Sequence, residues 1–168
     1  MAIPKPFAHA GFLSYLETLD DTAAPRPAGA ALSPLLARLL WPGDGAARSG
    51  EVVGDLIRLL QARRTMLQVA FETEQVADEL RRYQKFAKPG QPSPHIVQLR
   101  RQQATTRLAC SQSRQAFVQA CAAFVRDAGI EVPPRVALEV FVGRWIEINL
   151  PGDVAPADGL AGRVDPQA

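Results

Sequence analysis

Histidine and cysteine, the side chains most often used for catalysis and metal binding, are rare in this sequence. It has two histidines, His9 and His95, and two cysteines, Cys110 and Cys121. The zinc-binding patterns C-x-x-C and H-E-x-x-H are absent, and so is the E-x-x-H pattern of di-iron bundles. The signatures of phosphate loops, Rossmann folds and α/β-hydrolases are also absent. We therefore expect no cofactor, no metal and no catalytic residue, with both histidines on the surface.

Four carboxylates, Glu72, Glu74, Asp78 and Glu79, fall within about two turns of a predicted helix. A pair of carboxylates can carry acid–base catalysis when burial separates the two pKa values. These side chains, however, lie largely off the apolar positions of that helix. We therefore interpret them as a solvated helix face.

The two cysteines are eleven residues apart within one predicted helix. That is about three turns, so they share a face but are too far apart to form a disulfide with each other. We expect Cys110 and Cys121 to be reduced, buried, small apolar side chains. The alternative is an intermolecular disulfide or a redox sensor, which a reducing compartment disfavours.

The distribution of charge is the feature most relevant to function. The net charge is only +2, yet residues 80–126 include no Asp or Glu. This span has nine Lys and Arg residues, whereas the rest of the chain has the other ten together with all 17 acidic residues. The span therefore carries +9 and the remainder −7. Apart from Arg126, its cations are the candidate binding residues Arg81, Arg82, Lys85, Lys88, Arg100, Arg101, Arg107 and Arg114.

Two long helices must position these cations. From about Ser49 to Lys88, apolar residues recur in steps of three and four without a proline, which predicts one long helix. The same spacing predicts a second helix from Pro94 to about Ala128. Pro-Gly and Ser-Pro punctuation places a short turn near residues 89–93, so we expect the two helices to be antiparallel.

The predicted turn would bring the basic residues together. If it is centred near Gln91, Arg82 lies level with Arg100, and Arg81 lies level with Arg101. Four guanidinium groups at one height repel each other unless an anion or solvent relieves the repulsion. Carboxylates one turn earlier on the first helix could neutralise part of this charge. The sequence thus predicts a protruding basic end of the hairpin.

Shorter elements flank the hairpin. Residues 7–20 and 33–41 have helical spacing and are each followed by a segment containing proline and glycine. Residues 135–149 have the β-branched content of a strand but the apolar spacing of a helix. We prefer a helix, because a lone strand would have no partner, and we expect Trp145 in the core. Residues 151–168 predict a poorly ordered tail.

Together these patterns predict an all-α fold. We expect a helical bundle built on one long antiparallel helical hairpin (50–128), with short N-terminal helices and a C-terminal helix, and residues 1–150 as a single domain. The N-terminus lacks the basic and apolar regions of a signal peptide. No stretch has the apolar length of a membrane-spanning helix. We therefore expect a cytoplasmic protein without membrane contact.

The charge pattern favours a non-enzymatic helical accessory or adaptor subunit, which docks an acidic protein through the basic hairpin end. The alternative is a nucleic-acid-binding small helical subunit of a nucleoprotein complex, for example an RNA-guided effector complex. That alternative rests on analogy of architecture. A solvated end that binds nothing, and an enzyme whose site follows no known motif, are further alternatives. The oligomeric state is left open.

Overall fold

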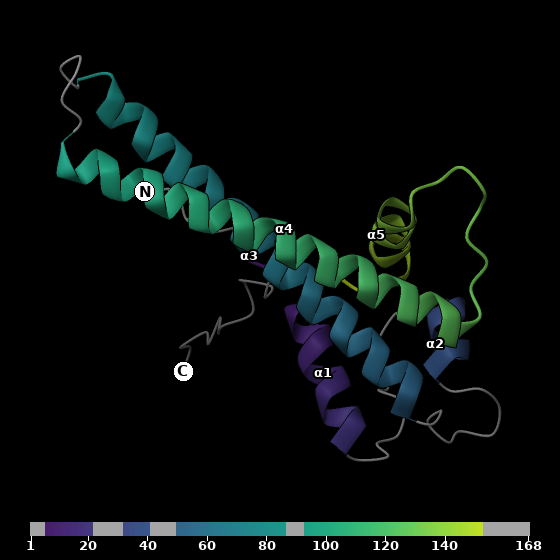
Figure 1. The fold of residues 1–168 in the computed structure, drawn as a ribbon. Helices are drawn as coiled ribbons and strands as arrows, with labels where there is room; N and C mark the ends of the chain where they lie inside the picture. The colour runs from purple at the N-terminus through teal and green to yellow at the C-terminus, as the bar shows by residue number, and fades with distance from the viewer. Residues whose placement is uncertain (1–5, 22–31, 41–49, 87–92, 153–168) are drawn as a thin grey trace, which may run out of the picture.

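The computed structural model describes residues 6–21, 32–40, 50–86 and 93–152. Within these ranges the fold is all-α, as predicted, and α3 and α4 form the long antiparallel hairpin (Figure 1). The helices are α1 (Ala10–Asp21), α2 (Pro34–Leu40), α3 (Gly50–Gln84), α4 (Pro94–Ala128) and α5 (Leu138–Asn149).

The ends of α4 follow from capping residues. The hydroxyl of Ser93 accepts a hydrogen bond from the Ile96 amide. Pro94 occupies the first turn, where a backbone N–H would have no partner within the helix, so its missing N–H costs nothing. Gly129 ends the helix in the left-handed conformation, with φ of 64°. This helix begins and ends where the sequence predicted. The predicted turn and Lys88 lie within residues 87–92, outside the described residues.

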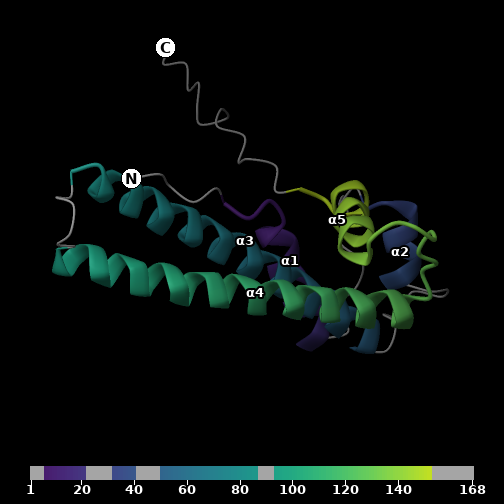
Figure 2. The same ribbon diagram turned by 45° about the horizontal axis from the view of Figure 1, so that its top comes forward.

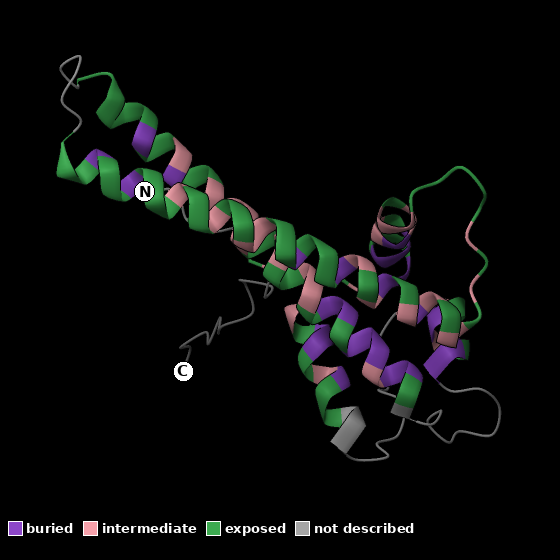
Figure 3. Ribbon diagram, in the orientation of Figure 1, coloured by how far each residue is buried: buried purple, intermediate pink, exposed green. Residues whose placement is uncertain are grey.

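The core lies at one end of the hairpin. Helices α1, α2 and α5 pack around residues 52–66 of α3 and 117–128 of α4, a region that we call the base. Buried residues are concentrated there, and the rest of the hairpin is mostly exposed (Figure 3). The largest fully buried side chains of the base are Phe124, Leu16, Leu36, Leu40, Leu56, Leu59, Leu60 and Ile146.

The other end of the hairpin is a two-helix projection. We call residues 72–86 and 93–107, which contain the end of α3 and the start of α4, the arm; it extends away from α1, α2 and α5 (Figures 1 and 2). A separate small cluster of Leu80, Ile96 and Leu99 holds its two helices together. Because only one seam is apolar, the remaining faces of the arm are exposed to solvent.

Residues 138–149 form a helix, which resolves the ambiguity between helix and strand. Trp145 is buried as predicted, and its ring lies 5.0 Å from that of Phe124. Arg63 of α3 donates a hydrogen bond to the carbonyl oxygen of Gly143 at 3.1 Å and another to Glu147 at 2.9 Å. Long-range contacts with the hairpin therefore position α5.

The prediction of two surface histidines is half wrong. His95 is exposed, but His9 is buried and its Nδ1 lies 3.0 Å from the carbonyl oxygen of Pro151. The ring of His9 also contacts that of Phe7 edge-on, with centroids 5.7 Å apart. The burial arises because the segment before α1 packs against the chain that follows α5, a contact between distant parts of the sequence.

The two cysteines differ in burial. Both are free thiols; Cys121 is buried, as predicted, but Cys110 is only half-buried. Burial raises the pKa of the Cys121 thiol to about 12, so this group stays protonated at neutral pH. We expect a thiol reagent to label Cys110 faster than Cys121 in the native protein, as measured by mass spectrometry of timed samples. Equal rates, each matching those in denaturant, would contradict this burial.

Candidate docking surface

Exposed cations surround the arm outside its apolar seam. Leu80, Ile96 and Leu99 are buried in the apolar seam between α3 and α4. Because neighbouring residues of a helix point in different directions, the residues that follow these three face solvent. Of the eight predicted binding residues, Lys88 lies outside the described part of the chain. The other seven are all exposed: Arg81, Arg82, Lys85, Arg100, Arg101, Arg107 and Arg114.

Two of these arginines are paired within the molecule. Arg81 forms an ion pair with Asp78, three residues earlier on α3. Arg114 forms an ion pair with Glu139 of α5, and this pair lowers the pKa of the Glu139 carboxyl. Arg114 thus links α4 to α5 near the base. It is less available to a partner than the sequence predicted.

Four exposed arginines of the arm form no ion pair with a described residue. Within the described ranges, the side chains of Arg82, Arg100, Arg101 and Arg107 make no ion pair, whereas the nearby Arg81 does. The pair between Asp78 and Arg82 that the spacing allowed is not formed, because Asp78 contacts Arg81 instead. The arm therefore presents guanidinium groups that an anionic partner could bind.

The register of the hairpin differs from the predicted one. The Thr73 hydroxyl donates a hydrogen bond to the carbonyl oxygen of Thr106. The ring of Tyr83 lies 4.3 Å from that of His95. These contacts place Arg82 level with the first turn of α4, about one helical turn before Arg100.

Helix α3 ends at Gln84, about one turn before the end that its apolar spacing predicts, and the register of the two helices is shifted accordingly. The arginines are consequently spread along the arm. The prediction that they gather at one height is wrong.

An exposed aromatic pair lies among these cations at the free end of the arm. Tyr83 is 47% exposed in the last turn of α3, and Phe86, which follows the end of that helix, is 88% exposed. His95 contacts the ring of Tyr83 edge-on and lies 3.8 Å from the Glu79 carboxylate, which limits the positions that Tyr83 can adopt. An exposed phenylalanine beside free arginines is typical of an interface anchor.

The acidic cluster of α3 behaves as predicted. Glu72, Glu74, Asp78 and Glu79 are all exposed, which fits a solvated helix face. No group of three or more metal-ligating side chains comes together among the described residues. The cluster therefore contributes local ion pairs to the arm.

A shallow groove of about 590 Å³ lies beside the middle of α3. Phe7, Leu67 and Phe71 provide its apolar lining, and Arg64 and Glu74 provide charges of both signs. Mixed charge gives the groove no clear preference for an anionic or a cationic ligand. No sequence pattern indicated this groove, because it requires the segment before α1 to fold back onto α3.

None of the described helices combines the length and the apolar character needed to span a bilayer. Comparison of the chain with protein-family models, with curated proteins and with solved structures finds no match. The charge, exposure and shape of the arm are therefore the observations that bear on function.

Proposed function

We propose that this protein is a non-enzymatic helical accessory or adaptor subunit that docks an acidic protein through its arm. The observation that carries the proposal is the set of four exposed arginines without an ion pair among the described residues, on a projection outside the core. Unpaired like charges raise the energy of the free protein, and a partner of opposite charge relieves that energy. Carboxylates of the partner would therefore pair with the arginines of the arm.

The shape of the molecule supports this role. The base holds the packed core, so changes on the arm leave most of the buried apolar surface untouched. The arm is only two helices thick and projects from the base (Figures 1 and 2). A projection of this shape suits insertion into a recess of a larger assembly. Phe86 supplies an apolar anchor, and aromatic and arginine side chains dominate the energy of many protein interfaces.

A nucleic acid is the second candidate partner. Gln98, Gln102 and Thr105 are exposed on α4 near its arginines. Such side chains commonly contact phosphate and sugar, whereas the arginines would neutralise phosphates. Tyr83 and Phe86 offer only a small surface for base stacking. We favour the protein partner, because Phe86 and Tyr83 suit a small apolar contact better than a row of stacked bases.

The test compares two matched variants with the parent in a pull-down from the source cell. The arm variant replaces Arg82, Arg100 and Arg101 by Gln. The control variant replaces three exposed arginines of the base, Arg38, Arg64 and Arg144, by Gln as well. Both variants change the net charge from +2 to −1. We expect the arm variant to lose the partner and the control to retain it, with similar thermal melts for all three proteins.

Nuclease treatment before the pull-down separates the two candidate partners. Recovery of the same protein after treatment supports an acidic protein partner. Loss of all bound material after treatment favours the nucleic acid. If the arm variant and the parent recover the same partners, the arm is not the docking surface.

A further inference from the structure

A buried carboxyl group, Asp55, lies at the opposite end of the hairpin from the arm. Asp55 is 4% exposed and lies near the start of α3 among the buried apolar residues Val52, Val53 and Leu56. Arg58 donates a hydrogen bond to its Oδ1 at 3.0 Å. The other oxygen, Oδ2, is also buried and has no hydrogen-bond donor. A buried acceptor without a donor destabilises the folded state unless it gains a proton or a partner.

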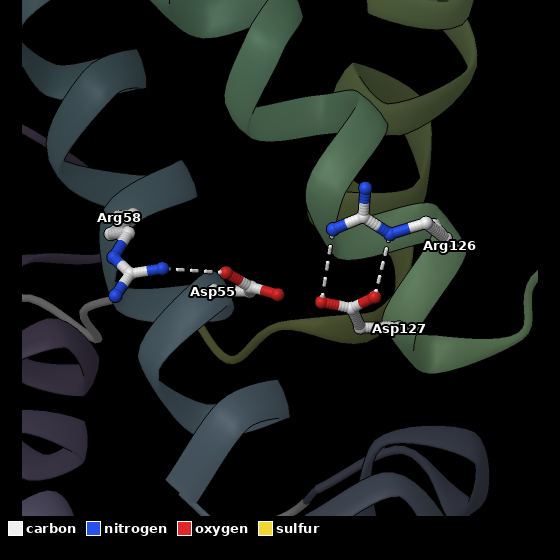
Figure 4. Close-up of polar contacts among 4 residues, drawn as sticks. All are labelled: Asp55, Arg58, Arg126 and Asp127. Carbon is white, nitrogen blue, oxygen red and sulfur yellow. Dashed lines mark hydrogen bonds and ion pairs between the residues drawn. The ribbon is translucent and has the colours of Figure 1, made fainter.

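The unpartnered oxygen of Asp55 points toward a second carboxylate, that of Asp127 (Figure 4). Asp127 lies in the last turn of α4 and accepts a hydrogen bond from Nε of Arg126 at 2.8 Å. Two ionised carboxylates repel each other, and neither has a hydrogen to donate. A proton on Asp55 Oδ2 removes the repulsion and provides an O–H that can donate to Asp127.

We propose that Asp55 and Asp127 form a site that binds one proton and thereby ties the beginning of α3 to the end of α4. Asp55 carries the proton, and Asp127 remains ionised beside Arg126. The proton is taken up from solvent when the two helices come together. The site is independent of the proposed docking function, since none of its residues belongs to the arm.

The electrostatics of the two groups agree with this arrangement. Burial raises the pKa of Asp55, and the contact with Asp127 raises it further, against the opposing effect of Arg58. The hydrogen bond from Arg126 lowers the pKa of Asp127, and the neighbouring Asp55 carboxyl lowers it further. The charged groups that act on Asp55 come from α3 and α4, and the described residues of α1, α2 and α5 contribute none.

The direction of the pH dependence follows from linkage. A carboxyl group with a raised pKa binds more protons in the folded state than in the unfolded state. The stability that Asp55 contributes is therefore complete below its unfolded pKa and is lost as pH rises through its folded pKa. Asp127 has the opposite sign, and its contribution is lost only as pH falls through its lowered pKa. The bond between the two carboxyl groups therefore forms at pH values above the lowered pKa of Asp127 and below the raised pKa of Asp55. It weakens toward alkaline pH.

The test replaces Asp55 by Asn, which keeps the acceptor for Arg58 and donates to Asp127 at every pH. We expect Asp55→Asn to melt a few degrees above the parent at alkaline pH, where the Asp55 carboxyl of the parent is ionised, and the difference to close as the pH falls and this carboxyl takes up its proton. The matched control is Asp78→Asn. Asp78 also pairs with an arginine three residues away on α3, but it is exposed, so no such crossing is expected.

A second measurement does not depend on how well Asp55→Asn folds. The carbon-13 shift of the Asp55 carboxyl in the parent should titrate above the range of an ordinary aspartate. In Asp127→Asn the Asn amide can donate to Asp55, so the same signal should titrate at lower pH. An Asp55 carboxyl that titrates in the ordinary range, or a melt of Asp55→Asn that runs parallel to the parent at all pH values, overturns the proposal.

Discussion

Replacing Trp145 by alanine is expected to lower the free energy of unfolding by about 3–5 kcal/mol, the cost of truncating a buried aromatic side chain. Trp145 is 7% exposed and packs against Phe124 of α4. The cavity left by its removal would lie between α5 and the hairpin. Because these contacts position α5, their loss should destabilise the whole base.

Chemical denaturation followed by far-UV circular dichroism measures this loss. The matched control is Ile148→Ala, three residues later on α5, because Ile148 is 77% exposed. A surface change of this kind usually alters stability by no more than about 0.5 kcal/mol. A loss below about 1 kcal/mol for Trp145→Ala would mean that α5 contributes little to the core.

The elements that could be predicted from the sequence are those with local signals. Helix α4 has a serine cap, a proline in its first turn and a glycine at its end, and these residues set its limits through their own backbone preferences. The apolar spacing of α3 and α4 similarly predicts their shared seam. Such features depend on residues a few positions apart, so the sequence displays them directly.

The features that could not be predicted depend on contacts between distant residues. His9 is buried by the chain near Pro151, and the spacing around either residue indicates nothing about that contact. The register of the arm follows from where α3 ends, and helix ends are the least certain part of a spacing argument. An error of a few residues there moved Arg82 by about one turn relative to Arg100.

Asp55 has a local signal in the sequence, but its partner does not. It is an acidic residue inside a run of apolar ones, with Val52 and Val53 before it and Leu56 and Ile57 after it. A charge in such a run must be paired or must take up a proton. The identity of the partner, Asp127 at the far end of α4, becomes visible only when the hairpin is folded.

The candidate binding residues were only partly predictable for the same reason. The span without carboxylates, residues 80–126, includes the exposed arginines of the arm, but it also includes Arg114, which lies nearer the base. Which of them are free depends on side-chain geometry: Asp78 pairs with Arg81, and Glu139 of α5 pairs with Arg114. A count of charges along the chain cannot distinguish these paired residues from Arg82 or Arg100.

Reversing the charge of Arg82, Arg100 and Arg101 by replacement with Glu is expected to slow association with an acidic partner by about 10- to 1,000-fold at low salt. Each replacement changes the charge by two units, so the net charge falls from +2 to −4. The three side chains are exposed and make no ion pair with a described residue, so the melting temperature should change little. Stopped-flow or biosensor kinetics with the recovered partner measure the effect.

The dependence on salt separates steering by the arm from other causes of weak binding. Screening shortens the range of charge interactions from about 10 Å at 0.1 M salt to about 3 Å at 1 M, so the difference between variant and parent should shrink as salt rises. Replacing Arg38, Arg64 and Arg144 by Glu gives the same net charge without touching the arm, and this control should slow association far less. Equal slowing in both variants would show that net charge, rather than the arm, guides the partner.

If the partner is a nucleic acid, the slope of log affinity against log salt should instead fall by about one unit for each phosphate that the variant no longer neutralises.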